Sequence, residues 1–304
     1  MFHLALTEEL EKQALEELNE TPDKRDEVRK HLIEWIHQEP HVKFRTDGLW
    51  LLNFIRGAKF STQKTKQKIL AHLTAKVIVP EIFSNRDALQ PVLQEMITKG
   101  FTLPFHTHDK NCVLIRWEAL NSNADFFDVA KLSLMIFEIV LNESDSVLVS
   151  GNYIIIDMKK FPLGFLKQAN PTILNRLLKH SYAAYPSRVK LMAFINCING
   201  TEHIFNMAKP FIPTKILNRV VFYGENYSEL YRTISQTYFP KEYGGSLHSI
   251  SDLIEFWKNK LESNREWFME NDKYSFDSDQ KLLVLKDANN MFGTEGSFRR
   301  LEVD

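Results

Sequence analysis

The chain has 304 residues, of which 44% are hydrophobic and 25% charged, and its formal net charge is -1. A charge this close to zero creates no global field that would attract nucleic acid, so we expect no nucleic-acid partner, and any affinity for anions must come from a local patch. No uncharged apolar run reaches the ~18 residues of a spanning helix, and the first residues lack the basic start of a signal peptide. We therefore expect a cytoplasmic protein.

The first part of the chain has the pattern of a small, all-helical unit. Residues 8–38 repeat apolar side chains at helical spacing, with an interruption at Thr21-Pro22-Asp23. A strongly apolar segment covers residues 49–55, and Ser61 is a suitable N-cap for a basic helix that runs to residue 77. We place this helical unit at residues 1–85.

A change of pattern follows a transition at residues 80–104, where Asn85, Pro91 and Gly100 indicate turns. Short apolar runs at residues 112–117, 153–157, 191–196 and 220–223 alternate with helical segments at 124–142 and 171–182. Unalternating apolar strands separated by helices are typical of a parallel sheet covered on both faces. We predict an α/β sandwich with a mostly parallel sheet at residues 86–250.

The last part of the chain is more polar. A helix is predicted at residues 227–237 and an amphipathic one at 249–261. Beyond Ser263 the sequence is rich in Asp, Asn and Gly, so we expect a C-terminal helix and a polar tail at residues 251–304 that is partly disordered or loosely attached.

Signatures of catalysis are absent from the sequence. No nucleophile elbow, dinucleotide fingerprint or P-loop occurs, and Cys112 and Cys197 have no zinc-ligand spacing. His106, His108 and Asp109 have spacing that allows a shared metal, but the sequence implies no further ligand, and a solvated loop is the favoured interpretation. Asp157 ends an apolar strand and is expected to cap the following turn. We predict that the protein is not an enzyme and has no metal or cofactor.

Residues 203–212 have the pattern of a broken amphipathic helix. Ile204, Phe205, Ala208 and Ile212 lie on one helix face, and Pro210 removes a backbone hydrogen bond, so the helix should break there. Two interpretations remain open: a kinked helix packed on the sheet, or a lid over a cavity with its hinge at the proline.

Basic residues flank this helix in two pairs. Arg188 and Lys190 are two apart at the start of a strand, and Lys215 and Arg219 are four apart on a helix, so each pair shares a face. The pairs lie at the ends of one strand–helix–strand unit and can converge on an anion. A solvated surface is the alternative.

Several motifs, in order along residues 10–261, resemble the CRAL-TRIO lipid-binding family. Residues 54–60 (FIRGAKF) resemble the signature that closes its helical unit, and residues 153–157 (YIIID) resemble its central strand. The run from Tyr185-Pro186 through Lys209-Pro210-Phe211 to Gly224 and the loop at 239–245 (FPKEYGG) also match. The resemblance is to the tocopherol and retinaldehyde carriers of that family, in their insect form.

This resemblance implies a lipid cavity closed by a lid helix and a site for a phosphoinositide head group. The ligand-binding positions it implies are Ala130, Ser133, Phe137, Ile156, Phe161, Leu177, His180, Tyr185, Val189, Met192, Ile204, Phe205, Ala208 and Ile212. The phosphoinositide-binding positions are Arg188, Lys190, Lys215, Arg219 and Lys59, and a further arginine of the family falls on Ala58.

The function implied is intracellular transfer of a small hydrophobic ligand between membranes. Tocopherols, retinoids, carotenoids and similar lipids all suit an apolar cavity. The partners are then that ligand and an anionic membrane surface, to which the protein would bind peripherally and transiently. The alternative is a lipid-sensing adaptor or regulatory module without net transport.

Overall fold

The computed structural model describes residues 6–107, 109–120, 123–168, 170–225 and 227–293. The part before the sheet is helical, as predicted. Thr21 Oγ1 accepts a hydrogen bond from the backbone N–H of Lys24 at 3.2 Å, and Ser61 Oγ accepts one from that of Lys64 at 3.4 Å, so both side chains cap the helices that follow them. These helices are α1 (Glu8–Gln13), a π-helical turn (Ala14–Leu18), α2 (Pro22–Gln38), α3 (Gly48–Gly57), α4 (Thr62–Ile78), α5 (Pro80–Phe83) and α6 (Pro91–Lys99).

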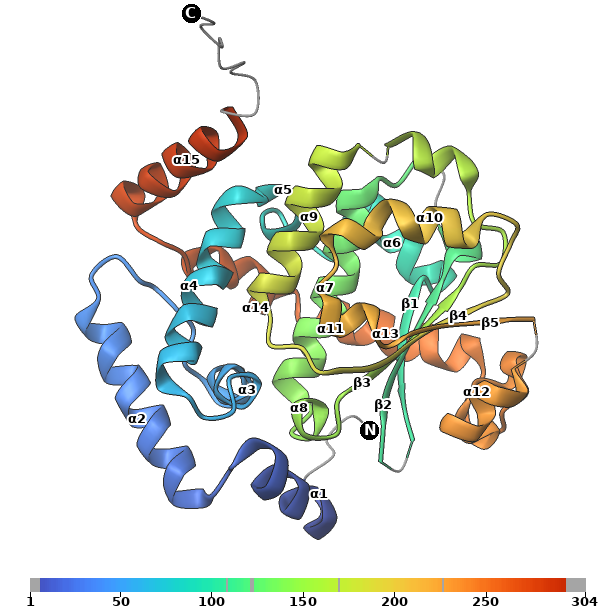
Figure 1. Ribbon diagram of the computed structural model, residues 1–304, viewed down its shortest axis with the longest axis horizontal. Coiled ribbons are helices and arrows are strands. Elements are labelled where there is room, and N and C mark those ends of the chain that lie inside the picture. The colour runs from blue at the N-terminus through green and yellow to red at the C-terminus, as the bar shows by residue number, and fades with distance from the viewer. Residues whose placement is uncertain (1–5, 108, 121–122, 169, 226, 294–304) are drawn as a thin grey trace, which may run out of the picture.

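One five-stranded sheet forms the centre of the second part (Figure 1). Its strands lie in the order of the chain, with β1 antiparallel to β2 and every other neighbour parallel. The predicted α/β class with a mostly parallel sheet is confirmed. The strands are β1 (Thr102–His106), β2 (Asn111–Arg116), β3 (Asn152–Asp157), β4 (Val189–Ile195) and β5 (Val220–Gly224).

The order of the strands decides where the helices lie. Crossovers between neighbouring parallel strands are almost always right-handed, so successive crossovers of an in-order sheet cover the same face. In Figure 1, α9 and α10 lie on one side of the sheet and α12 on the other. The crossover helices are α7 (Phe126–Glu143) and α8 (Val147–Ser150), then α9 (Pro171–Ala184), then α10 (Thr201–Ala208) and α11 (Thr214–Leu217).

After the sheet, the chain continues through α12 (Ser228–Thr233) into a tight loop and α13 (Ile250–Ser263). Gly245 belongs to the loop, and a Cβ atom there would lie 1.6 Å from the carbonyl oxygen of Phe239, so only glycine fits. Ser249 and Asp252 form a reciprocal capping box at the start of α13. Trp257 of α13 donates a hydrogen bond from Nε1 to the carbonyl oxygen of Pro104, which joins α13 to β1.

The prediction that residues 80–104 form a transition made of turns was wrong in part, because this segment contains α5, α6 and the start of β1. Pro104 lies inside β1, where proline argues against a strand in general. An edge strand tolerates proline since one row of its N–H groups has no partner in the sheet, and β1 is at the edge.

The expectation of a loosely attached tail was wrong for residues 265–277, whereas no residue of the last helix whose burial is described is buried. The chain forms α14 (Arg265–Glu270) and α15 (Ser278–Gly293), and the side chains of Phe268 and Phe276 are buried. The guanidinium of Arg45 lies 4.7 Å from the ring centroids of both Trp267 and Tyr274. Single aromatic side chains pack this segment against the N-terminal part of the chain. They do not recur at helical spacing, so the sequence pattern did not indicate the packing. Residues 294–304 lie outside the described residues.

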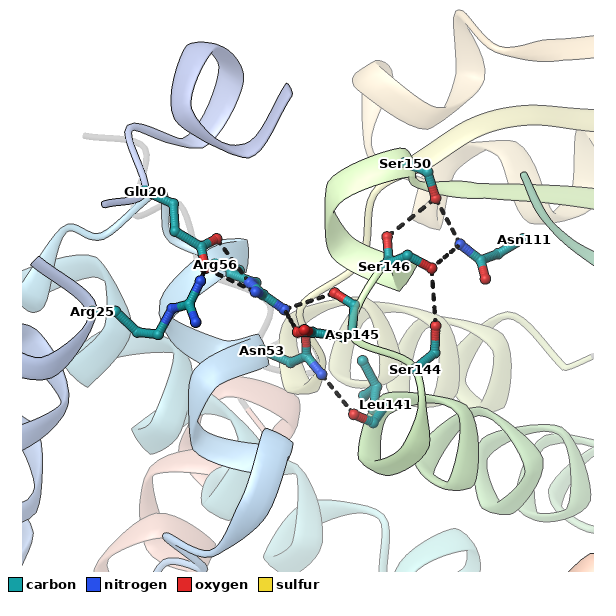
Figure 2. Close-up of polar contacts among 10 residues, drawn as sticks. All are labelled: Glu20, Arg25, Asn53, Arg56, Asn111, Leu141, Ser144, Asp145, Ser146 and Ser150. Carbon is teal, nitrogen blue, oxygen red and sulfur yellow. Dashed lines mark hydrogen bonds and ion pairs between the residues drawn. The ribbon is translucent and has the colours of Figure 1, made fainter. Parts of the chain in front are cut away.

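A buried polar network joins the N-terminal helices to the connection between α7 and α8 (Figure 2). The guanidinium of Arg56, fully buried, forms two hydrogen bonds of 2.8 Å with the carboxylate of Glu20 and a salt bridge of 2.5 Å with Asp145. Asn53 Nδ2 donates to the carbonyl oxygen of Leu141 at 2.6 Å. Arg56, the arginine of the FIRGAKF motif, therefore ties the two parts of the chain together.

Candidate functional site: an apolar cavity beside a basic cluster

An apolar cavity of about 440 Å³ lies between the sheet and the crossover helices α7, α9 and α10. Strand residues two apart contribute to its floor, because alternate side chains of a strand point to the same face: Ile154 and Ile156 from β3, Met192 and Phe194 from β4. α7 is apolar on nearly all sides because one part packs in the core while Phe126, Val129 and their neighbours line the cavity. This arrangement suits a hydrophobic small molecule.

Most of the positions implied by the family resemblance meet at this cavity. Those that line it are Ala130, Ser133, Ile156, Phe161, Leu177, Met192, Ile204, Phe205, Ala208 and Ile212. Phe137 and Tyr185 instead line a smaller chamber of about 190 Å³, while His180 and Val189 line neither. The two chambers are adjacent and share wall residues, among them Ser133, Ser181 and Tyr182.

Sequence reasoning missed several lining residues, among them Trp117, Phe194 and Leu166. Phe194 is two residues after Met192 on the same strand face, so strand alternation was a usable signal. Trp117 lies in a short 3₁₀ turn after β2 and contacts Phe161 with ring centroids 4.6 Å apart. The turn is too short to show a repeating apolar pattern, so no signal in the sequence indicated the contact between Trp117 and Phe161.

Helix α10 closes one side of the cavity and has few buried side chains. Thr201 is its one buried residue, whereas Ile204 and Phe205 are half-buried and line the cavity. The ring of Phe205 contacts those of Phe194 and Phe222, each at 5.6 Å between centroids. The helix ends at Ala208, and a 3₁₀ turn over Lys209–Phe211 includes Pro210. The predicted break at the proline is confirmed.

The structure brings Arg188, Lys190, Lys215 and Arg219 together, and these residues are called the basic cluster below. Burial and then repulsion by Arg188, Arg219 and Lys215 lower the pKa of Lys190. Burial and repulsion by Arg219 lower the pKa of Arg188. A site crowded with like charges is stabilised by a bound anion. Lys59 is exposed on the turn after α3, and no described interaction joins it to the cluster.

A carboxylate already occupies part of the basic cluster. Glu17, in the π-helical turn, forms a short salt bridge with Arg188 and lies 3.8 Å from Lys190 Nζ. Gln13 Nε2 holds the same carboxylate at 2.8 Å. Arg188 Nη1 also donates to the carbonyl oxygen of Val149 at 2.6 Å. The N-terminal segment thus supplies an internal counterion that no sequence motif indicated.

The other candidate positions have structural roles. Asp157 Oδ1 accepts a hydrogen bond from the backbone N–H of Lys159 at 2.9 Å, which confirms that this carboxylate caps the turn. In the described part of the chain, no group of three or more His, Cys, Asp or Glu side chains is placed to hold a metal. His108 of the suggested metal group lies outside the described residues. Among the described helices, none has the length and apolar character to cross a bilayer.

Comparison with known sequences agrees with this fold. Residues 98–245 match the CRAL/TRIO domain, and residues 21–93 match the Pinta-like UBA domain. The chain is therefore a CRAL/TRIO domain protein, with an N-terminal helical region that is UBA-like. Lipid binding, and not catalysis, characterises this family.

The relatives are distant. The chain is 28% identical to the mouse (Mus musculus) alpha-tocopherol transfer protein-like protein over 273 residues, which is 87% of this chain and 77% of that protein. It is 25% identical to Clavesin-1 of Xenopus laevis over 251 residues, 81% of this chain and 75% of that protein. The crystal structure of Sfh5 aligns with a TM-score of 0.49 at 13% identity, covering 77% of this chain and 92% of that chain.

Proposed function

We propose that the protein binds one small hydrophobic ligand in the cavity and transfers it between membranes. The observation that carries the proposal is the apolar cavity itself, about 440 Å³ in volume and bordered by the weakly anchored helix α10. Tocopherols, retinoids, carotenoids and similar lipids are the ligand classes that fit. The likeness to alpha-tocopherol transfer protein-like proteins supports the same conclusion.

Burial of the ligand provides the affinity. A ligand that hides ~500 Å² of apolar surface gains about 12 kcal/mol at ~25 cal/mol per Å². Ordering of ligand and protein offsets a large part of this gain, which leaves affinities in the sub-micromolar range. Such a ligand leaves slowly into water and readily into a bilayer, so release requires contact with a membrane.

The basic cluster and α10 provide that contact. An opened α10 exposes Ile204 and Phe205, which can enter the membrane interface. Anionic head groups, phosphoinositides above all, then face Arg188, Lys190, Lys215 and Arg219, each worth ~1 kcal/mol near a charged surface. Docking favours the open state, so membrane binding and ligand release are coupled by population shift.

Lipid extraction and a transfer assay test the proposal. Protein purified from its native tissue is extracted and the extract is analysed by mass spectrometry, and then the protein is tested for transfer of the identified lipid between donor and acceptor vesicles. We expect one lipid per chain and transfer that is faster with phosphoinositide in the acceptor vesicles. A stoichiometric lipid without transfer would favour the lipid-sensing adaptor instead, and absence of any bound lipid would overturn the proposal.

A further inference from the structure

The smaller chamber contains polar groups that the fold leaves without partners. Asn152, at the start of β3, is 4% exposed, and its Nδ2 has no hydrogen-bond partner among the described residues. Ser181 Oγ, from α9, is also buried and without a partner in the described structure. Both residues line the smaller chamber, and Ser181 borders the larger one as well. The wall of the smaller chamber thus contains two polar residues whose side chains have buried atoms without a partner, and one of the two is shared with the larger chamber.

The neighbouring strand carries an amide whose donor has a partner within the fold. Asn111 of β2 is directly opposite Asn152 in the register of the sheet and is also 4% exposed. Its Nδ2 donates to Ser150 Oγ at 2.7 Å, and Asn111 lines neither chamber. A buried amide donor without a partner destabilises a fold. Asn271 Nδ2 is also without a partner in the described structure but lines neither chamber, whereas Asn152 lies where a bound molecule can supply the missing acceptor.

The walls also define the charge of that partner. No charged side chain among the described residues lines either chamber. The nearest buried carboxylate, Glu138, is already paired: Arg86 Nη1 lies 2.7 Å from it, and Tyr185 of the smaller chamber donates its hydroxyl hydrogen to it. A carboxylate or phosphate in the chamber would be buried without a counterion, which is strongly unfavourable. An uncharged polar group avoids that penalty.

We propose that the smaller chamber binds the polar end of an uncharged lipid, whose oxygen accepts a hydrogen bond from Asn152 Nδ2. The larger chamber holds the apolar remainder of the lipid. The inference rests on the proposed function, since it assumes that the cavity holds a lipid. The ligand class is then a long-chain alcohol, ketone, aldehyde or ester, and fatty acids and phospholipids are excluded.

Three molecules with one carbon skeleton test this assignment: phytol, phytane and phytanic acid, which carry a hydroxyl, no polar group and a carboxylate. Binding is measured on the full chain at neutral pH through tryptophan fluorescence, because Trp117 lines the larger chamber. We expect phytol to bind about tenfold more tightly than phytane, the effect of one added hydrogen bond to an orphaned donor. Phytanic acid should bind most weakly.

Asn152→Leu is the decisive variant, and Asn111→Leu is its matched control on the next strand. Asn152→Leu should reduce phytol affinity about tenfold, to the level of phytane, and leave phytane unaffected. It should also keep or raise the melting temperature, because it removes an unsatisfied amide. Asn111→Leu breaks an existing hydrogen bond, so it should lower the melting temperature and keep the preference for phytol.

Three outcomes would overturn the inference or its basis. Equal binding of phytol and phytane by the wild-type protein refutes the inference that the smaller chamber binds a polar group, and it is still consistent with lipid binding in the apolar cavity. A parallel loss of phytol and phytane binding in Asn152→Leu means that the residue acts by packing, which also refutes it. Failure of the wild-type protein to bind any of the three molecules refutes this inference, whereas the proposed function fails only if the protein extracted from its native tissue also holds no lipid.

Discussion

Two boundaries of the sheet domain are built on opposite principles. At the first, the N-terminal helices are tied to the α7–α8 connection by the fully buried guanidinium of Arg56, paired with Glu20 and Asp145 (Figure 2). At the second, α10 covers the cavity with Thr201 as its one buried residue and half-buried apolar side chains as its remaining contacts. One boundary depends on paired charges in exact positions, and the other on apolar contacts that a lipid can replace.

The difference shows how a carrier can combine stability with opening. Removing one partner from a buried ion pair leaves an uncompensated charge, so such a boundary separates only when the whole fold does. Apolar contacts are not directional, so α10 can exchange contacts with Phe194 and Phe222 for contacts with a ligand or a membrane at low cost. Local opening is expected where few side chains are buried.

The largest expected effect comes from the rigid boundary. Arg56→Met removes the guanidinium from buried Glu20, which keeps its ion pair with Arg25 at 2.6 Å, and from Asp145, whose side chain is 25% exposed. We expect a loss of ~3 kcal/mol in the free energy of unfolding, measured by urea denaturation. Arg232→Met, which removes an exposed salt bridge with Glu229 at 2.6 Å, should cost less than ~0.5 kcal/mol. Similar losses in the two variants would contradict a special role for the buried network.

Charge on the inner face of α10 should have the next largest effect, on ligand binding. Phe205→Asp places a carboxylate against the cavity, and we expect at least ~100-fold weaker ligand binding, or about 2.7 kcal/mol, with a small change in melting temperature. Asn206→Asp adds the same charge on the exposed face of the helix and should bind ligand normally. Wild-type affinity in Phe205→Asp would show that α10 does not cover the ligand.

Reversal of charge in the basic cluster should weaken membrane binding by a smaller amount. The double variant Lys215→Glu/Arg219→Glu is expected to bind phosphoinositide-containing vesicles ~30-fold more weakly, from ~1 kcal/mol for each basic residue near the surface. Its ligand capacity should be unchanged. The control Lys99→Glu/Lys258→Glu alters charge equally on α6 and α13. Vesicle sedimentation decides, and equal binding by both double variants would refute the cluster as the docking site.

The smallest expected effect is a gain. Glu17→Gln frees Arg188 and Lys190 from their internal counterion, so affinity for the same vesicles should rise about fivefold, equivalent to ~1 kcal/mol. Glu16→Gln changes the net charge identically, but Glu16 is exposed and its carboxylate lies 3.9 Å from Nζ of Lys12, four residues earlier in the chain. If both variants bind vesicles equally well, the gain reflects overall charge and not release of the cluster.

Local patterns were sufficient for the parts of the fold that repeat. Apolar runs separated by helices predicted the parallel strands β2 to β5, and Pro210 predicted the end of α10. The strand β1 was missed because Pro104 is acceptable only at a sheet edge, and an edge is known only once the strand order is known. The order of strands is a property of the whole chain.

Contacts between distant segments were not predictable. Arg45 contacts the rings of Trp267 and Tyr274, which follow it by more than 200 positions in the chain, and no periodic pattern in the sequence indicates these contacts. The same is true of Glu17, whose pairing with Arg188 depends on how the N-terminal segment folds back. For the candidate site, family resemblance named positions on both chambers, whereas the orphaned amide of Asn152 is visible only in three dimensions.

The cavity has a consequence for the life of the protein itself. A volume of about 440 Å³ within the fold forgoes packing that a filled core would have. A molecule that fills it binds the folded chain and not the unfolded one, so the free energy of unfolding rises with ligand concentration, by ~2.7 kcal/mol at a hundred times the dissociation constant. Cells degrade proteins according to the fraction that is unfolded. The supply of ligand would then set the abundance of its own carrier.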